Sequence, residues 1–413
     1  MSTNLRDHFL NKLNVHALLE KYGSPLYVYS ESILRERLRE VRGLVDEPWF
    51  GVNISIKANG NPELLKIIRE EGCNGDAVSP GEIFLLEKAG FEPAQIIFVS
   101  NNVSPEEMQY ALDRNVLVSV DSLSQLETLG RLNRGGHVCL RFNPGAGAGH
   151  HEKVITAGTK TKFGIQKNMI DQAKAIANQY GMRIVGLNQH IGSLFMDNKP
   201  YLDGVSALLD IAREFEDLEF VDFGGGFGIP YRRYHGEERM DFAGLSQSLK
   251  TMVSQWMKAN GRRIRIKVEP GRYVFAECGA LLGTVHAVKT SYDRCYIGTD
   301  IGFNVLLRSA MYDAYHEITL FRNGRLLQDG ELTEATVVGN VCESGDILAR
   351  DRMLPAAREG DALAVLDAGA YGYAMSSNYN QRLRPAEVLI TSDGRDRLIR
   401  RRDRFEDLLS GLV

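Results

Sequence analysis

The sequence predicts a (β/α)₈ barrel together with a second, all-β domain. Between residues 52 and 271, short β-branched runs alternate eight times with stretches of helical period. From about residue 273 onward the chain changes to β-rich runs separated by turn signals. The length of 413 residues also exceeds what one hydrophobic core of ordinary size takes. A doubly wound open sheet is the competing topology for the first part.

The predicted barrel strands are short runs that end in polar or glycine-containing segments. They are VNISIKA (52–58), CNGDAVS (73–79), QIIFVS (95–100), VLVSVDS (116–122), HVCLRFNP (137–144), RIVGLNQHIGS (183–193), EFVDFGGGFG (219–228) and RIRIKVEPG (263–271). The segments between them have helical period, and several begin at Pro or Ser and end at Gly or Asn. Because such a barrel usually takes about 250 residues, the span is sufficient for one.

We therefore place the barrel at residues 35–272 and the β-sheet domain at residues 1–34 plus 273–413. In the β domain, the run EITLFRNGRLL carries Asn323-Gly324, a pair that suits a tight hairpin. The early strand-like run SPLYVYS is expected to join this domain.

One long segment, residues 145–164, follows the fifth predicted strand. Connections of this length within a compact domain tend to be functional, although a surface insertion is the simpler alternative. Its His150 and His151 are expected to be solvated, because nothing near them in the sequence completes a metal-binding set. No metal site is predicted.

The composition excludes several classes of partner. The chain carries 49 basic and 53 acidic residues, for a net charge of −4, and its only basic run is RRRDR near the C-terminus, so nucleic acid is not expected to bind. The five cysteines are scattered and show no C-x-x-C spacing, which fits a reducing cytoplasm. No stretch reaches the about 18 uninterrupted apolar residues of a membrane span. The sequence thus predicts a soluble cytoplasmic protein that does not bind membranes.

A distinctive mix of polar residues follows the predicted strands. The strand ends carry Lys57, Asp76, Asp121, Arg141, His190, Gly224 to Gly226 and Glu269. In a barrel the C-terminal ends of all strands meet at one rim, where barrel enzymes carry their active sites. The alternative, that polar residues merely mark where strands enter solvent, accounts for each residue but not for the chemical combination.

This combination suits pyridoxal 5'-phosphate. The GGGFG segment at 224–228 offers backbone N–H groups to an anion, and a lysine at the first strand end can hold an aldehyde as a Schiff base. His190 could stack on the cofactor ring, although a buried core histidine is the more common case. Glu269 could keep a pyridine nitrogen protonated, which would strengthen the electron sink, or could simply pair with Arg272.

Taken together, the motifs resemble the fold-type III pyridoxal-phosphate decarboxylases, which share the alanine racemase-like fold and include the diaminopimelate and ornithine decarboxylases. The resemblance covers nearly the whole chain and is carried by KAN (57–59), HIGS (190–193), GGGFG (224–228), EPGR (269–272), CESGD (342–346) and GAYG (369–372). It implies that catalysis uses Lys57, His190 and Cys342. It implies a cofactor site made of Lys57, Asp76, Arg141, His190, Ser193, Gly225, Gly226, Glu269 and Tyr371. It implies a substrate site made of Arg272, Arg308, Tyr312, Glu343 and Tyr371.

The resemblance also implies a reaction and an assembly. Arg308 and Tyr312 stand where diaminopimelate decarboxylases bind the distal end of their substrate, and Glu343 follows Cys342 where diamine-forming relatives carry aspartate. An arginine suits a carboxylate and a glutamate suits an ammonium group. The implied reaction converts meso-diaminopimelate to L-lysine and CO₂ in lysine biosynthesis. The implied enzyme is a homodimer, in which Cys342 reaches the partner's site and donates a proton to the reacting carbon.

Three alternatives remain open at this point. Ser309, Asn340 and SIKANGNPEL depart from the usual family pattern, which leaves room for a related decarboxylase of another amino acid with a distal carboxylate. An amino-acid racemase of the same fold is a second alternative, but those enzymes place an arginine at the pyridine nitrogen, where this chain has Glu269. A non-catalytic homologue is the third, and the presence of Lys57 and Cys342 argues against it.

Overall fold

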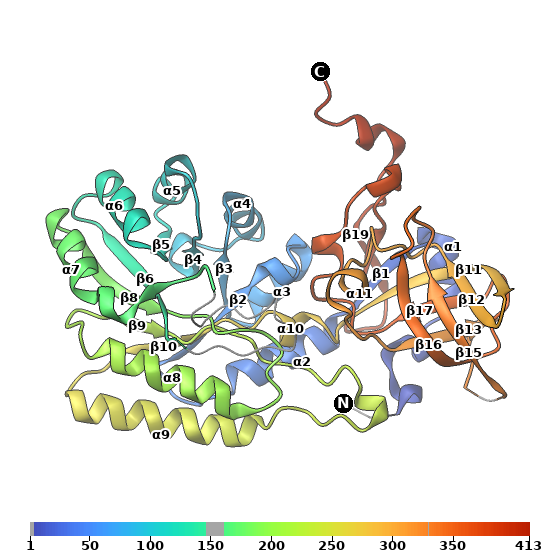
Figure 1. Ribbon diagram of the computed structural model, residues 1–413, viewed down its shortest axis with the longest axis horizontal. Helices are drawn as coiled ribbons and strands as arrows, with labels where there is room; N and C mark the ends of the chain where they lie inside the picture. The colour runs from blue at the N-terminus through green and yellow to red at the C-terminus, as the bar shows by residue number, and fades with distance from the viewer. Residues whose placement is uncertain (1–3, 146–160, 329) are drawn as a thin grey trace. The chain divides into compact units, whose positions relative to one another are not determined.

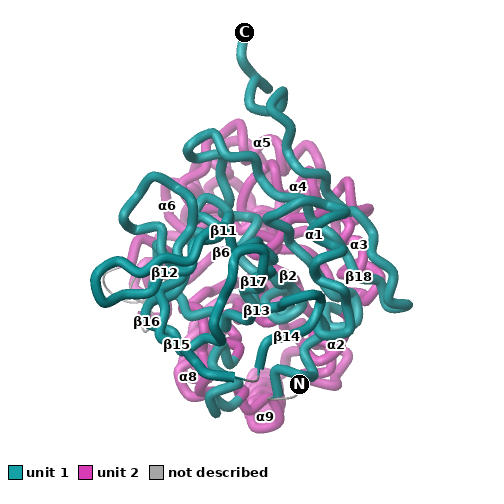
Figure 2. Tube along the Cα trace, turned by 90° about the vertical axis from the view of Figure 1, so that its right-hand side faces the viewer, with its two compact units in different colours: residues 1–34, 230–238, 274–413 teal, residues 35–229, 239–273 magenta. Residues whose placement is uncertain are grey.

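The computed structural model describes residues 4–145, 161–328 and 330–413. The chain forms two compact units, which Figure 2 shows in different colours. Unit 1 consists of residues 1–34, 230–238 and 274–413, and unit 2 consists of residues 35–229 and 239–273. Residues 230–238 fall inside the range predicted for the barrel, yet they belong to unit 1.

Unit 2 is a closed parallel barrel (Figure 1). Its strands pair in the order β2-β3-β4-β5-β6-β8-β9-β10, and β10 pairs with β2 to close the ring. The closed ring excludes the open-sheet alternative, and each predicted run overlaps one strand, so the barrel prediction is confirmed. The strands are β2 (Phe50–Ser55), β3 (Asn74–Ala77), β4 (Ile96–Val99), β5 (Leu117–Val120), β6 (His137–Asn143), β8 (Arg183–Asn188), β9 (Phe220–Asp222) and β10 (Arg265–Val268), with the short β7 (Ile165–Gln166) pairing onto β6.

Helices follow most of the barrel strands along the chain. Their starts are fixed by side chains that accept hydrogen bonds from the first free backbone N–H groups: Asn61 before α3, Ser79 before α4 and Ser104 before α5, each followed by proline at the first helical position. The helices are α2 (Glu31–Arg42), α3 (Pro62–Glu70), α4 (Pro80–Lys88), α5 (Pro105–Leu112), α6 (Leu123–Leu132), α7 (Ile170–Gln179), α8 (Asn198–Ala212), α9 (Phe242–Asn260) and α10 (Arg272–Phe275).

Unit 1 is built on a curled, mostly antiparallel sheet. Its strands run in the order β14-β13-β17-β11-β1-β18-β19, and β12, β15 and β16 continue from β11. The strands are β1 (Leu26–Ser30), β11 (Gly279–Ser291), β12 (Arg294–Thr299), β13 (Ile318–Arg322), β14 (Arg325–Leu326), β15 (Leu332–Val338), β16 (Ile347–Pro355), β17 (Ala362–Val365), β18 (Ala386–Ile390) and β19 (Asp396–Arg400). The helices are α1 (Val15–Tyr22) and α11 (Arg308–Tyr312).

Two expectations for the β unit are confirmed. The early strand β1 lies inside this sheet, antiparallel to β11 and parallel to β18. Strands β13 and β14 form the predicted hairpin, and Asn323 and Gly324 at its turn have φ values of 51° and 75°. Left-handed φ values at both turn residues match the twist of the flanking strands, which explains the Asn-Gly pair.

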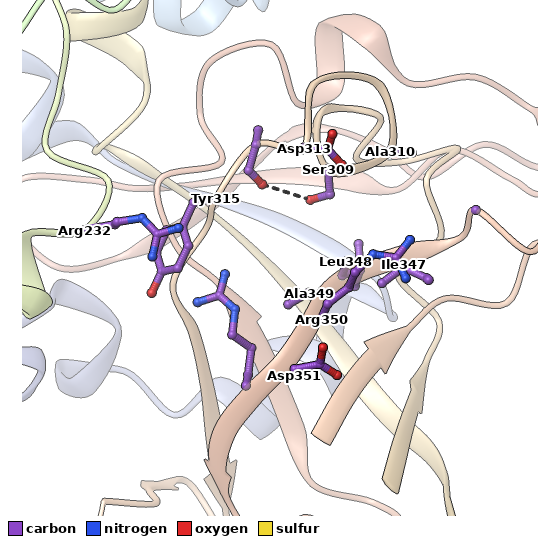
Figure 3. Close-up of a pocket in the computed structure, with 13 residues that line it drawn as sticks. Arg232, Ser309, Ala310, Asp313, Tyr315, Ile347, Leu348, Ala349, Arg350 and Asp351 are labelled. Atoms are coloured by element: carbon purple, nitrogen blue, oxygen red, sulfur yellow. Dashed lines mark hydrogen bonds between the residues drawn. The ribbon is translucent and has the colours of Figure 1, made fainter. Parts of the chain in front are cut away.

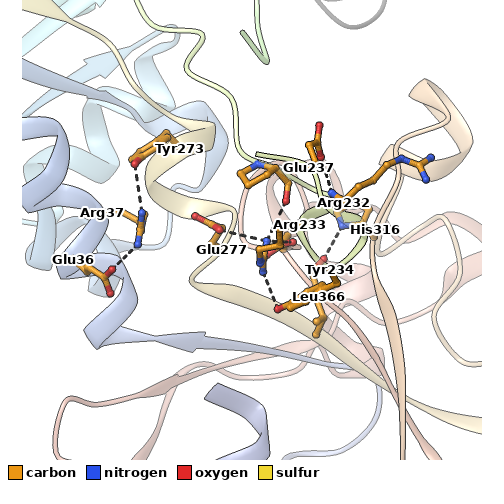
Figure 4. Close-up of polar contacts among 12 residues, drawn as sticks. Glu36, Arg37, Arg232, Arg233, Tyr234, Glu237, Tyr273, Glu277, His316 and Leu366 are labelled. Carbon is orange, nitrogen blue, oxygen red and sulfur yellow. Dashed lines mark hydrogen bonds and ion pairs between the residues drawn. The ribbon is translucent and has the colours of Figure 1, made fainter. Parts of the chain in front are cut away.

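Residues 230–238 are held in unit 1 by a buried ion pair (Figure 4). The guanidinium of Arg233 donates two hydrogen bonds to the Asp367 carboxylate, at 2.7 and 2.8 Å. It also lies 3.3 Å from the Glu277 carboxylate, a contact that Figure 4 shows. All three side chains are buried within this unit. Because an arginine fork matches a carboxylate in geometry, this contact ties the segment between β9 and α9 to the strands of unit 1.

The described residues contain no membrane-spanning helix, no metal-binding cluster and no disulfide. No helix among them is long and apolar enough to cross a membrane. Within the same residues, no three or more His, Cys, Asp or Glu side chains gather in a way that could hold a metal ion. All five cysteines are free thiols. His150 and His151, with most of segment 145–164, lie outside the described residues.

Candidate active site

The polar residues predicted at the strand ends lie at the C-terminal rim of the barrel. Lys57 lies in a single 3-10 turn (Ile56–Ala58) directly after β2, and His190 and Glu269 follow β8 and β10 within two residues. Asp76 and Arg141 belong to the last part of β3 and β6. Because all these strands run parallel in one closed ring, their C-terminal ends share one side of the barrel.

Lys57 lies next to a buried carboxylate. Its Nζ atom is 3.9 Å from Oδ2 of Asp76, and the same oxygen accepts a hydrogen bond of 2.7 Å from Oγ of Ser55. Asp76 is 1% exposed, and its Oδ1 atom has no hydrogen-bond partner among the described residues. A buried carboxylate stabilises a nearby ammonium group, so Asp76 is placed to influence the charge and position of the lysine.

Glu269 is buried in the barrel, where Nδ2 of Asn188 donates to its Oε1 atom at 3.1 Å. Burial raises the pKa of Glu269 well above its usual value, and the carboxylates of Asp222 and Asp76 raise it further, whereas Lys57 and Arg141 act in the opposite direction. The rim therefore contains a carboxyl group whose protonated form is favoured, and whose carboxylate form would be stabilised by a cationic partner.

Arg141 provides a second cation at the rim, and unlike Lys57 it is buried. It is 7% exposed, and its guanidinium carbon lies 4.7 Å from the centre of the Phe163 ring. Burial lowers its pKa, while the carboxylates of Glu269, Asp121 and Asp76 raise it. The neighbouring carboxylates thus offset part of the effect that burial has on the pKa of Arg141.

His190 is in contact with the glycine segment. The backbone N–H of Gly225 donates to Nδ1 of His190 at 3.4 Å. Burial lowers the pKa of His190 well below its ordinary value, and the charges of Lys57 and Arg141 lower it further. The imidazole is therefore neutral, and its Nδ1 atom acts as an acceptor.

The glycine segment is closely packed against neighbouring backbone. A Cβ atom at Gly225 would lie 1.9 Å from the carbonyl oxygen of Glu269, and one at Gly226 would lie 2.6 Å from that of Gly192. Gly226 also has a φ of +105°, which residues with side chains rarely adopt. Glycine is required here for the chain to turn closely beside Glu269 and Gly192.

Ser193 and Arg272 are joined in the structure. The Oγ atom of Ser193 accepts hydrogen bonds from Nε and Nη2 of Arg272, at 3.2 and 3.0 Å. The sequence-based hypothesis assigned Ser193 to the cofactor phosphate and Arg272 to the substrate. Because these side chains are in contact, the hydroxyl and the guanidinium lie close enough to bind the same anion.

The other predicted residues belong to unit 1. Arg308 is buried, and its Nη1 atom contacts the hydroxyl of Tyr231 at 2.8 Å and Nε2 of His316 at 3.0 Å. Tyr312 ends the same short helix, α11, and is partly buried. The structure therefore fixes the direction of the Arg308 side chain through two ring-bearing neighbours within unit 1.

Cys342, Glu343 and Tyr371 lie in loops of unit 1. Cys342 and Glu343 are exposed; the backbone N–H of Cys342 donates to Oδ1 of Asn380 at 2.7 Å, and Glu343 accepts a hydrogen bond of 2.5 Å from the hydroxyl of Tyr379. Tyr371 has a φ of +57°, a strained value for a residue with a large side chain. Such strain is concentrated at functional loops, which agrees with the GAYG motif.

Unit 1 also contains a cavity of about 460 Å³ (Figure 3). The guanidinium carbons of Arg232 and Arg352 lie 3.9 and 3.8 Å from the centre of the Tyr315 ring, and Arg350 also lines the cavity. None of the site residues predicted from the sequence is among its lining residues. This cavity is therefore separate from the residues of the candidate site.

Four buried polar residues of the barrel were missed by the sequence-based hypothesis. Ser55 contacts Asp76 and Asn188 contacts Glu269, while Asn53 donates to Asp222 at 3.3 Å. A signal was available, because side chains two residues apart on a strand point to the same face. Counting back from Lys57 in steps of two leads to Ser55 and then Asn53. The same step leads from His190 to Asn188 and from Gly224 to Asp222.

Comparison with known proteins places the chain in a family. Residues 33–276 match the family model described as "Pyridoxal-dependent decarboxylase, pyridoxal binding domain". This chain belongs to the pyridoxal-dependent decarboxylases. The predicted family is thereby confirmed, and the chain is an enzyme of the carboxy-lyase class.

Relatives of this decarboxylase share nearly its full length. The diaminopimelate decarboxylase of Methanothermobacter thermautotrophicus is 42% identical over 95% of this chain and 92% of its own. A crystal structure of a diaminopimelate decarboxylase matches with a TM-score of 0.92 and 33% identity, over 99% of this chain and 98% of its own. The Helicobacter pylori enzyme complexed with L-lysine matches with a TM-score of 0.87 and 28% identity, over 95% and 98%.

The barrel of this decarboxylase has the donor set that pyridoxal phosphate requires. Lys57 supplies an amine for the aldehyde, and the buried carboxyl of Glu269 suits a ring nitrogen. The glycine segment and the Ser193–Arg272 pair supply the kind of donors that a phosphate group accepts from. The residues present therefore fit the cofactor that the family name implies.

Proposed function

We propose that this decarboxylase converts meso-diaminopimelate to L-lysine and CO₂. The observation that carries the proposal is the similarity over nearly the full chain, up to 42% identity, to proteins named diaminopimelate decarboxylase. The Helicobacter pylori relative forms a complex with L-lysine, the compound that remains when diaminopimelate loses one carboxylate. The same chemistry places the enzyme at the last step of a lysine-forming sequence.

The proposed cofactor is pyridoxal 5'-phosphate. When bound, it supplies an electron sink for the electron pair that the departing carboxylate leaves behind. Lys57 would hold its aldehyde, His190 would stack on its ring and Glu269 would face its ring nitrogen. Asp76 and Arg141 would set the charge around these groups, while the phosphate contacts would come from Ser193, Gly225, Gly226 and Tyr371.

The barrel residues support these roles through their contacts. The Lys57 amine lies 3.9 Å from the Asp76 carboxylate, which would limit the positions that the free amine can take. His190 carries no proton on Nδ1, because the N–H of Gly225 points at that atom. A neutral imidazole presents a flat apolar face, and it adds no positive charge beside Lys57 and Arg141.

The far end of the substrate would be bound by residues of both signs. Arg308 is held by Tyr231 and His316, so its guanidinium is pre-oriented for a carboxylate. Glu343, supported by Tyr379, would bind the distal ammonium group. The proposed substrate contacts also include Arg272, Tyr312 and Tyr371. A diamino dicarboxylate offers a distal carboxylate to Arg308 and a distal ammonium group to Glu343, whereas lysine and ornithine lack the distal carboxylate.

Cys342 is proposed to deliver the proton that replaces CO₂. Its thiol would give a proton to the carbon that lost the carboxylate, and solvent would restore the thiol. We further propose a homodimer in which Cys342 and Glu343 serve the partner's barrel, since both are exposed on the isolated chain. A cytoplasmic location completes the proposal, because five free thiols fit a reducing compartment.

The substrate proposal is tested by CO₂ release from meso-diaminopimelate, L- and D-lysine, L- and D-ornithine, arginine and glutamate. Turnover of diaminopimelate alone supports it. A cofactor-loaded enzyme that is silent on diaminopimelate but active on another amino acid with a distal carboxylate would replace it with the paralogous decarboxylase.

The shared site is tested by mixing two inactive variants. Lys57→Ala and Cys342→Ala would each lack activity alone. If the partner supplies Cys342, a mixed dimer contains one site with both residues intact, so co-refolding the two variants restores turnover. Mixtures that stay inactive while forming mixed dimers would contradict the sharing of residues.

A further inference from the structure

A layer of four polar side chains lies inside the barrel, next to the proposed ring-nitrogen position. Asn53 on β2, Asn188 on β8, Asp222 on β9 and Glu269 after β10 are each 2% exposed or less. Asn53 donates to Asp222 at 3.3 Å, and Asn188 donates to Glu269 at 3.1 Å. Each carboxyl group is thus held by one carboxamide from another strand.

The strand pairing brings these side chains together. Asn188 on β8 is the register partner of Asp222 on the neighbouring strand β9. The residue whose carboxamide binds Glu269 therefore lies beside Asp222 in the sheet. Glu269 follows β10, which pairs with β9 on one side and β2 on the other. The two carboxyl groups therefore belong to one closed, water-poor layer.

The layer has fewer donors than acceptors. Asp222 and Glu269 together present four carboxyl oxygens, and the backbone N–H of Gly224 adds one further donor, to Oδ1 of Asp222 at 2.9 Å. Oδ1 of Asn188 is buried and has no hydrogen-bond partner within the described parts of the chain. Leaving buried acceptors unsatisfied costs free energy, and two ionised carboxylates in one layer repel each other. A single added proton supplies a donor and removes one charge.

We propose that the pair formed by Asp222 and Glu269 carries a single proton, and that Asp222 is a positioning residue which keeps this proton on Glu269. The inference deepens the proposed function, because Glu269 is the residue proposed to face the cofactor's ring nitrogen. On cofactor binding, the proton would move from the Glu269 carboxyl oxygen to that nitrogen and leave a carboxylate paired with the N–H group. Asp222 keeps its charge throughout, and no proton is taken from solvent.

The surrounding charges are compatible with a shared proton. Burial raises the pKa of Asp222 to about 6. Burial raises the pKa of Glu269 well above its usual value, and the carboxylates of Asp222 and Asp76 add to this effect. The groups that face the pair from the other elements are the cations Lys57, Arg141 and Lys267, the carboxylate Asp76, and the uncharged Cys139 and Tyr201. The burial of both carboxyl groups and the one neighbouring carboxylate, Asp76, thus oppose the three cations.

The test is an infrared titration of the full-length, cofactor-free chain. Wild type minus Glu269→Gln should show the C=O band of one protonated carboxyl group at neutral pH. Asp222→Asn keeps an acceptor for the Gly224 N–H but removes the second carboxyl, so the band should titrate at a lower pH than in wild type. Absence of the band at neutral pH, or an unchanged midpoint in Asp222→Asn, overturns the proposal.

Two control variants test whether the C=O band comes from Glu269. Glu71→Gln removes a buried carboxylate whose pKa is lowered by Arg39 and Arg35, so it should leave the band unchanged. Glu82→Gln removes a partly buried carboxyl group whose pKa is also raised, and so identifies any band from it that overlaps. If Asp222→Asn fails to fold, titrating wild type that carries ¹³C-labelled aspartate and glutamate carboxyl groups gives the same answer: two coupled steps support the proposal and two independent ones overturn it.

A second readout is the number of protons taken up when pyridoxal phosphate binds. Calorimetry in buffers of different ionisation enthalpy should give more proton uptake in Asp222→Asn than in wild type, by up to one proton. Equal uptake overturns the proposal. Neither readout depends on turnover, so a failed substrate panel would leave this result standing, and a failed titration would leave the substrate assignment standing.

Discussion

Ser55 donates a hydrogen bond of 2.7 Å to the same oxygen of Asp76 that lies 3.9 Å from the Lys57 amine. The serine hydroxyl also lies 3.2 Å from the backbone carbonyl of Glu269, so it connects three strand ends of the barrel. Ser55 and Asp76 are both buried. A buried hydroxyl thus fixes the carboxylate that in turn faces the lysine.

Ser55→Ala should lower the free energy of unfolding by about 1.5–3 kcal/mol, because it removes a hydrogen bond to a buried charged group. Urea denaturation measures this value. Ser100→Ala is the matched control, since Ser100 donates at 2.8 Å to a neutral backbone carbonyl and should cost only about 1 kcal/mol. Equal losses in the two variants would contradict the larger cost assigned to the hydrogen bond of Ser55.

Lys57→Ala should abolish the visible absorption of the purified enzyme, because it removes the amine beside Asp76 that is proposed to hold the cofactor aldehyde. The spectrum of the purified protein is the measurement. Lys66→Ala, in the partly exposed Lys66–Glu63 pair on α3, should leave the colour unchanged. A colourless wild type, purified with added pyridoxal phosphate, would contradict the cofactor assignment.

Glu82 should make the cofactor-free chain less stable as pH rises. Burial raises its folded-state pKa from 4.5 to about 7, so between these values the folded chain keeps a proton that the unfolded chain releases. The free energy of unfolding should fall across this window by up to about 3 kcal/mol. Urea denaturation of wild type and Glu82→Gln at several pH values measures the slope, and a slope that persists in Glu82→Gln assigns it to other groups.

Arg233→Ala should be strongly destabilising, by about 3–5 kcal/mol, because it leaves the carboxylates of Asp367 and Glu277 buried without their cation. Thermal or urea unfolding shows the effect. Arg395→Ala breaks the exposed pair with Asp393 and should cost at most about 1 kcal/mol. A small loss in Arg233→Ala would mean that water reaches the two carboxylates.

Much of the barrel could be predicted because each strand is a short apolar run that ends at a polar residue. Parallel closure then brings Lys57, His190 and Glu269 to one rim, so their proximity followed from strand direction alone. Asp222 and Asn188 were not recognised, because each lies inside an apolar run just before a more conspicuous motif. Their roles depend on which faces of neighbouring strands meet, and strand register is fixed only by the closed sheet.

The placement of residues 230–238 could not be predicted for a different reason. Nothing in their local sequence separates them from the barrel, and they lie between β9 and α9. Their partner Asp367 is far away in the sequence, and a single-sequence pattern carries no information on such a pairing. The hairpin at Asn323-Gly324, by contrast, was predictable because its signal is entirely local.

The pairing of β1 with β18 has a consequence for how the chain is made. Leu26 pairs with Ala386 in parallel, so a strand that is synthesised before the barrel pairs with one that is synthesised after it. During translation β1 can find its other neighbour, β11, only after the whole barrel has been synthesised. Its buried run LYVYS is therefore an exposed apolar edge on the nascent chain, where chaperone capture competes with aggregation.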